Sequence, residues 1–212
     1  MPPGPPGPAG QGATKGVAWK YATIRSADVK FTREVALAVY GKRSVPVWYF
    51  YVPFMFLLEA IRKGSFIRTF LQASTLPQEL AINAALELNR GEDKVTLLLR
   101  IEEPIRKWLS DLGIDTPGLF QKQMEEIGLQ LEHYSRLLKA DGDTYHALVK
   151  GAYTNREQYE VFLSQLHSVG RDACREVVAI LGDNKELAKR VQLTQQQSEK
   201  LREQEASGIF SQ

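Results

Sequence analysis

The chain has 212 residues, of which 43% are hydrophobic and 25% are charged. These values are ordinary for a globular protein with a real core, so they exclude disorder along the whole length. The single cysteine, Cys174, excludes an internal disulfide and any metal site built from several cysteines. The first twenty residues lack the apolar stretch of a secretory signal, which favours a cytoplasmic location.

The charge is unevenly distributed along the chain. Residues 1–70 contain ten Lys or Arg and three Asp or Glu, a net charge of +7, whereas the remainder carries −5. A basic front on an acidic body suggests an anionic partner, either a membrane surface or a nucleic acid. Chance scatter of the charges is the alternative interpretation.

The sequence divides into a tail and one helical domain. Residues 1–16 contain three PPG-like triplets, too few for a collagen triple helix, and are expected to form a disordered Pro/Gly-rich tail. A single domain over 17–206 follows. It comprises a basic aromatic front (17–72), a helical body (73–182) and a polar terminal helix (183–206), and residues 207–212 are expected to fray.

Capping residues, glycine and proline predict where the first helices start and stop. Ser26 can cap a helix that runs to Tyr40, with Gly41 just beyond its end. Thr75, followed by Pro77 and Gln78, predicts a second helix that stops at Gly91. The apolar run 95–101 fits a short strand or a helix, and the lack of a nearby pairing partner favours the helix.

Two apolar stripes predict a helical hairpin in the C-terminal half. Thr116-Pro117 opens a helix that closes near 140–142, and Thr154 opens another through a Thr-x-x-Glu capping box. The connection should include a short helical turn at 145–150. Helical spacing of three and four residues relates Phe120, Met124, Ile127, Leu131, Tyr134 and Leu138 on the first helix, and Tyr159, Phe162, Leu166, Val169, Ala173, Val177 and Ile180 on the second. The predicted fold class is therefore all-α, a bundle-like body with a C-terminal antiparallel helical hairpin.

The last helix is expected to start after the capping box at Asp183 and to run from Asn184 to about Ala206. Its stripe at 187, 191, 194, 198 and 201 includes two hydroxyl residues, so the seam is weak. Its far end is predicted to fray unless a partner covers it. The C-terminal helices are for this reason the expected binding surface for a protein partner.

An uncharged aromatic block occupies residues 45–58 (VPVWYFYVPFMFLL). A helix of that length covers roughly 21 Å, short of the roughly 30 Å of bilayer hydrocarbon. Pro46 and Pro53 divide the block, and a longer span would enclose several charges, so a single crossing is not favoured. Three interpretations remain: a wedge at a membrane interface, an ordinary core or subunit interface, and the wall of an apolar ligand pocket.

Basic residues on both sides of the block favour the wedge, with both ends on the cytoplasmic face of a membrane. The expected membrane or ligand contacts are Trp48, Tyr49, Phe50, Tyr51, Phe54, Phe56 and Phe66. The expected contacts with an anionic surface are Lys42, Arg43, Arg62, Lys63 and Arg68.

No catalytic, metal or cofactor signature is present. His133, His146 and His167 belong to no metal-binding motif. His167 and Cys174 lie seven residues apart on one predicted helix, roughly 10.5 Å along its axis, too far for a nucleophile–base pair. Nucleic-acid binding lacks a motif and is not favoured. The expected function is a non-catalytic adaptor or assembly subunit at a membrane surface; the alternative is a soluble helical enzyme or apolar-ligand-binding protein in which 45–58 lines a pocket.

Overall fold

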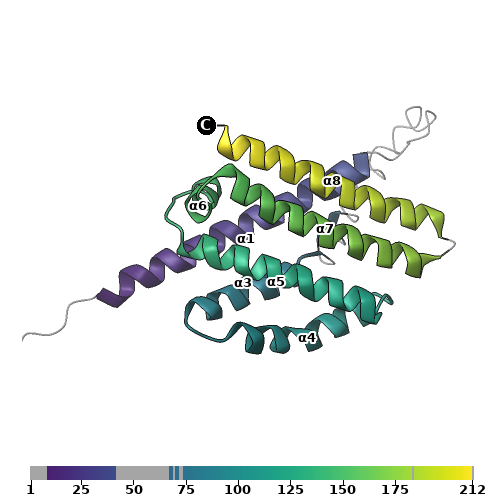
Figure 1. Ribbon diagram of the computed structural model, residues 1–212, viewed down its shortest axis with the longest axis horizontal. Helices are drawn as coiled ribbons and strands as arrows, with labels where there is room; N and C mark the ends of the chain where they lie inside the picture. The colour runs from purple at the N-terminus through teal and green to yellow at the C-terminus, as the bar shows by residue number, and fades with distance from the viewer. Residues whose placement is uncertain (1–8, 42–66, 69, 72–73, 183, 212) are drawn as a thin grey trace, which may run out of the picture.

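The computed structural model describes residues 9–41, 67–68, 70–71, 74–182 and 184–211. Within these ranges the chain is helical and contains no strand, which confirms the predicted all-α class (Figure 1). The helices are α1 (Ala9–Gly41), α3 (Leu76–Asn89), α4 (Lys94–Asp111), α5 (Pro117–Lys139), α6 (Tyr145–Ala152), α7 (Arg156–Leu181) and α8 (Lys185–Phe210).

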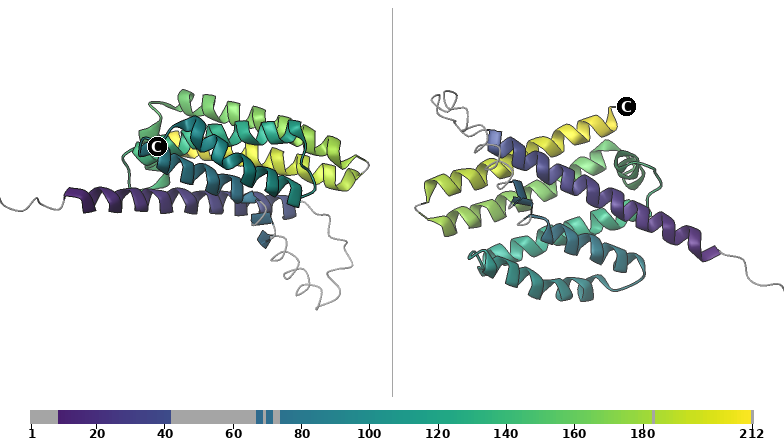
Figure 2. Two further views of the ribbon diagram at one scale, coloured as in Figure 1. Left: turned by 90° about the horizontal axis from the view of Figure 1, so that it is seen from below. Right: turned by 180° about the vertical axis from the view of Figure 1, so that it is seen from behind.

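The helices form a bundle that α1 crosses on one side. Helices α5, α7 and α8 lie side by side, and α3 and α4 complete the bundle next to α5 (Figure 1). Helix α1 runs diagonally across one face of this bundle, where it contacts α3, α5, α6 and α8. Its N-terminal part projects beyond the other helices (Figure 2). The long α1 therefore joins elements from both ends of the sequence.

The two predicted stripes supply the core between α5 and α7. Ile127, Leu131 and Tyr159 are among the side chains that are almost completely removed from solvent. Burial of an aliphatic side chain contributes roughly 1.5–3 kcal/mol, so this seam accounts for much of the attraction between the two helices. The predicted antiparallel hairpin is confirmed, with α6 in the connection between its two helices as the sequence suggests.

Side-chain capping contacts mark the starts of α4 and α5; the cap at Thr116 confirms a prediction, whereas the cap at Asp93 was not predicted. The Asp93 carboxylate accepts a hydrogen bond from the Thr96 amide at 3.0 Å, and Thr116 Oγ1 accepts one from the Leu119 amide at 3.2 Å. Residues 95–101 are helical, so the strand interpretation is wrong. Gly91 follows α3 with φ of 100°, a conformation in which glycine avoids the Cβ clash of other residues.

Other helix starts differ from the expected positions. Helix α1 begins at Ala9, so the second half of the segment 1–16 is helical and Ser26 lies inside the helix instead of capping it. No glycine pair or proline interrupts 17–26, and Ile24 within it is fully buried, although Val17 and Trp19 stay exposed. Thr75 precedes α3 but makes no capping hydrogen bond with its side chain. Helix α7 is capped by Asn155, one residue after Thr154.

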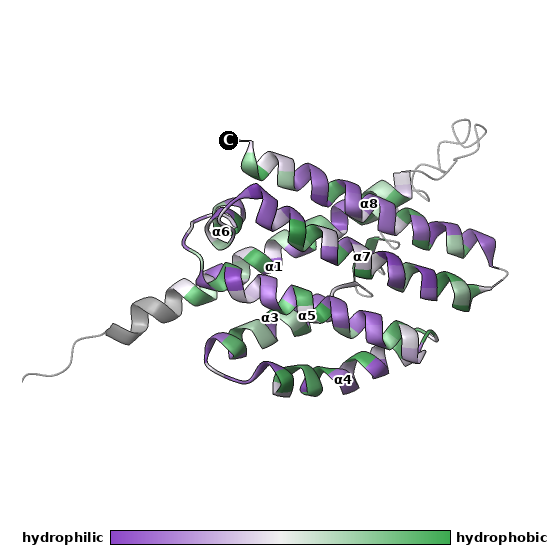
Figure 3. Cartoon of the chain, viewed as in Figure 1, coloured by the Kyte–Doolittle hydropathy of each residue, from purple (hydrophilic) through white to green (hydrophobic). Residues whose placement is uncertain are grey.

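The C-terminal end of α8 lies beyond the end predicted near Ala206. The helix is capped by Asn184, while Asp183 is outside the described residues, and it continues to Phe210. Ile209 is 1% exposed, and the Phe210 ring lies 5.9 Å from that of Tyr159. These two residues lie beyond the weak stripe, at the far end of a helix that is otherwise hydrophilic (Figure 3). In the described part of the chain, no helix is long and apolar enough to cross a membrane.

Candidate functional site

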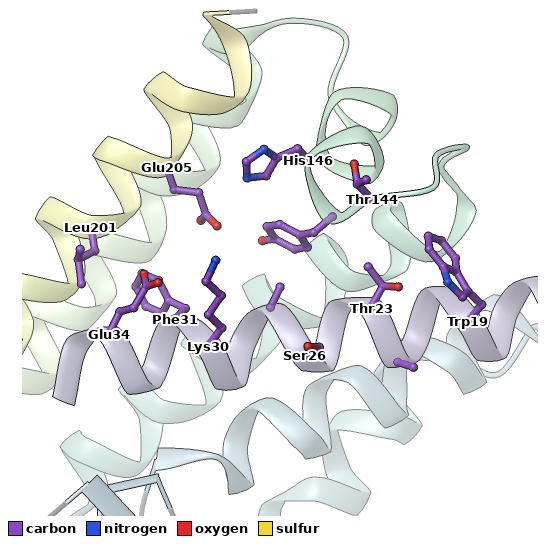
Figure 4. A pocket seen from close by; sticks show the side chains of 13 residues that line it. Trp19, Thr23, Ser26, Lys30, Phe31, Glu34, Thr144, His146, Leu201 and Glu205 are labelled. Atoms are coloured by element: carbon purple, nitrogen blue, oxygen red, sulfur yellow. The ribbon is translucent and has the colours of Figure 1, made fainter. Parts of the chain in front are cut away.

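A groove of about 770 Å³ lies between α1, α6 and α8 (Figure 4). Helix α1 contributes one continuous face to it, because the lining residues follow helical spacing over four turns. Thr144, Tyr145 and His146 come from the start of α6, and Leu201 and Glu205 come from α8. The α1 residues that line the groove are Trp19, Ala22, Thr23, Ser26, Ala27, Lys30, Phe31 and Glu34.

The opposite side of α1 holds the helix on the body. Ile24 and Ala36 are fully buried, and Val35 is 3% exposed. Arg25 forms an ion pair with Glu79 of α3. The helix is therefore fixed by its inner face, and the face from Trp19 to Glu34 stays open along the groove.

Charged groups gather at one end of the groove. The amino group of Lys30 and the ring of His146 both point toward the carboxylate of Glu205 (Figure 4). Burial raises the pKa of Glu205, an effect that Arg202, His146 and Lys30 oppose and Glu34 reinforces. Glu205 Oε2 is buried without a hydrogen-bond partner in the described part of the chain, and it lies 4.0 Å from Arg202 Nη1. This carboxylate therefore lies between the groove and the buried guanidinium of Arg202.

Arg202 is the centre of a buried charge cluster behind the groove. Arg202 is 7% exposed, and the central carbon of its guanidinium lies 4.1 Å from the centroid of the Phe31 ring. A guanidinium this far from water needs opposite charge nearby. Glu205 of α8 and Asp28 of α1 supply it, so the cluster joins the end of α8 to the middle of α1.

Asp28 is 6% exposed and has an unusual pKa for an aspartate. Burial raises the pKa from 3.8 to about 6, although the Arg202 charge and the Tyr134 hydroxyl lower it and Glu205 adds to the rise. Because the folded pKa exceeds the unfolded one, the contribution of Asp28 to stability is fully present below about pH 4 and is lost as the pH rises through about 6. At neutral pH the cluster keeps an ionised Asp28 only at a cost in free energy.

His133 lies in an aromatic cluster of the core. His133 stacks on Phe162 at 4.4 Å, shares a 2.7 Å hydrogen bond with the Tyr153 hydroxyl, and has its pKa lowered to about 3 by burial. Burial also raises the pKa of the half-buried Cys174, which disfavours a reactive thiolate. Among the described residues, no three His, Cys, Asp or Glu side chains are placed to hold a metal ion.

The sequence-predicted contact residues are mostly outside the described part of the chain. Arg68 is described, and it is exposed. The residues that fall outside are Trp48, Tyr49, Phe50, Tyr51, Phe54, Phe56, Phe66, Lys42, Arg43, Arg62 and Lys63.

The groove residues were not predicted from the sequence. The charge cluster behind the groove had only weak signals: Asp28 is one of three acids in residues 1–70, and Arg202 follows Leu201 of the weak stripe on the terminal helix. No protein-family model matches the chain, and comparisons with curated proteins and with solved structures found no match.

Proposed function

We propose that the protein is a non-catalytic adaptor or assembly subunit that holds a helical segment of a partner protein in the groove between α1, α6 and α8. The observation that carries this proposal is the open face of α1 from Trp19 to Glu34. That face is roughly 22 Å long, enough for about four turns of a partner helix. Helix-in-groove binding uses an elongated, partly apolar channel of this kind.

The chemistry of the groove defines the partner segment. Ala22, Ser26 and Ala27 are small, so a second helix can approach the α1 backbone closely along its middle. Phe31 and Leu201 offer apolar surface at one end. Lys30 and Glu34 lie four residues apart beside them, so an amphipathic helix with charges of both signs along one edge fits this channel.

A photoreactive residue in the groove tests the partner-binding part. A photo-crosslinking amino acid at Ser26 is expected to give one discrete adduct in cells, because Ser26 is exposed within the groove. The matched control is the same residue at Ser110, an exposed serine near the end of α4. Peptide mapping of the adduct should identify an amphipathic helical segment.

A second substitution makes the crosslinking test specific to the groove. Ala22→Trp fills the groove from an exposed position and should abolish the Ser26 adduct without unfolding the protein. Equal adducts from Ser26 and Ser110, or a Ser26 adduct that survives Ala22→Trp, would contradict the proposal.

The basic front is the proposed membrane contact of the adaptor. Its support is the net charge of +7 over residues 1–70. Arg33 and Arg68 are exposed, and the described residues include no ion-pair partner for either of them. Exposed cations near an anionic leaflet contribute about 1 kcal/mol each to binding at a surface.

Flotation with phosphatidylserine vesicles tests the membrane part. The full chain is expected to float with these vesicles at low salt, and the variant R62E/K63E/R68E should stay in the lower fraction. The control K185E/K189E/K200E changes the same number of charges at exposed positions on α8 and should float like the wild type. A wild-type protein that remains unbound would favour the alternative, in which block 45–58 lines a pocket for an apolar ligand.

A further inference from the structure

A second hollow, which shares Phe31 with the groove, opens between α1, α3, α4, α5 and α8. Its volume is about 250 Å³, enough for several waters or one small molecule. Polar side chains of α5 and α8 line one side of this chamber, and the rings of Phe70 and Trp108 lie on its wall. Phe70 and Trp108 are partly exposed, so the chamber is not sealed from solvent.

The chamber contains a buried hydrogen-bond acceptor without a donor. Gln130 is 6% exposed, and its Nε2 donates to Glu126 Oε1 at 3.1 Å. This bond fixes the orientation of the amide, which leaves Gln130 Oε1 buried with no hydrogen-bond partner in the described part of the chain. An unsatisfied buried acceptor costs free energy that a donor-bearing ligand would recover.

The chamber also contains a carboxylate without a cation. Glu126 has no ion-pair partner among the residues that the structure describes. Arg202 is the cation that acts on it electrostatically, but Arg202 is already placed between Asp28 and Glu205. Burial raises the pKa of Glu126, and Arg202 only partly offsets this effect. The site is therefore short of both positive charge and hydrogen-bond donors.

We propose that this chamber binds a small ammonium ion, either ammonium itself or a short primary alkylammonium ion. An ammonium group carries three or more N–H donors and one positive charge, so it can bond to Gln130 Oε1 and neutralise Glu126 together. Water can donate to the amide but leaves the charge uncompensated. Divalent metal ions need several oxygen ligands, usually with more than one carboxylate, whereas Glu126 is the only carboxylate among the described residues that line the chamber. Aromatic walls stabilise an organic cation further.

Thermal unfolding with simple salts tests this inference. Ethylammonium chloride and ammonium chloride should raise the Tm of the full-length protein in a saturable way, beyond the effect of sodium or potassium chloride at equal ionic strength. Isothermal titration with ethylammonium should give one site per chain. The variant Glu126→Gln removes the charge but keeps the shape, and it should weaken binding at least about tenfold.

Two further variants separate binding from folding. Glu103→Gln on α4 removes an exposed carboxylate that has no ion pair in the described chain, and it should bind ethylammonium like the wild type. If Glu126→Gln proves poorly folded, Gln130→Leu provides a second test, and it should also weaken the binding of ethylammonium. Equal Tm shifts by sodium, potassium and ammonium salts, or an ethylammonium response unchanged in both Glu126→Gln and Gln130→Leu, would overturn the inference and indicate a chamber filled by water.

Discussion

Replacing Arg202 with methionine is expected to lower the free energy of unfolding by about 3–5 kcal/mol at pH 7. Methionine fills most of the space but leaves Asp28 and Glu205 in the interior without a compensating charge. The measurement is urea denaturation followed by circular dichroism. The matched control is Arg171→Met, which removes a half-exposed guanidinium paired with Glu199 and should cost less than about 1 kcal/mol.

The pH dependence of the Arg202→Met effect identifies its cause. Arg202 lowers the pKa values of Asp28 and Glu205, so its removal raises both of them further. The carboxyls of the variant then take up protons as the pH falls, and the stability deficit should be smaller at pH 5 than at pH 7.5. Asp28→Asn in the Arg202→Met background should restore part of the loss at pH 7.5. A deficit that is independent of pH would indicate lost packing against Phe31 instead of an uncompensated charge.

Ile209→Ala is expected to destabilise the protein by about 2–5 kcal/mol, the range for truncation of a fully buried aliphatic side chain. Ile209 is 1% exposed and lies in the last turn of α8. Thermal unfolding measured by calorimetry checks the result. The control, Leu187→Ala, truncates a side chain that is 41% exposed in the first turn of the same helix and should change stability by less than about 0.5 kcal/mol.

The ordering of these two effects distinguishes a docked end of α8 from a frayed one. If the last turns of α8 were frayed, Ile209→Ala would be nearly neutral and would cost no more than Leu187→Ala. A large effect at Ile209 together with a small effect at Leu187 is expected, because the anchored part of α8 is its C-terminal part.

The sequence predicts the α5–α7 hairpin well, because local signals and packing agree there. Thr116 and Pro117 mark the start of α5, and the apolar stripes that begin at Phe120 and Tyr159 define the buried faces. The run 95–101 was ambiguous by composition, and the cap at Asp93 together with burial of Leu97 and Ile101 made it helical. Capping residues and apolar periodicity were therefore sufficient to predict the helices of this half of the molecule.

The groove and the cluster depend on contacts between distant residues, which no local pattern encodes. Asp28 and Arg202 are far apart in the chain, and each alone looks like an ordinary surface charge. Their burial arises because α1 crosses the bundle against the C-terminal half of α8, where Phe31 covers the guanidinium of Arg202. The same crossing places Glu205 beside Lys30 and His146, so the groove is a consequence of tertiary packing.

Amide hydrogen exchange along α8, read by mass spectrometry at neutral pH, tests the central claim that the C-terminal half of this helix is held on the body, with Arg202 against α1 and Phe210 near Tyr159 of α7, and forms one wall of the groove. Amides near Arg202, Ala206 and Ile209 are expected to exchange slower than those of 186–190 by about a hundredfold or more, because the former open only with the body of the protein. Faster exchange at the C-terminal turns than at the start of α8 would contradict the claim.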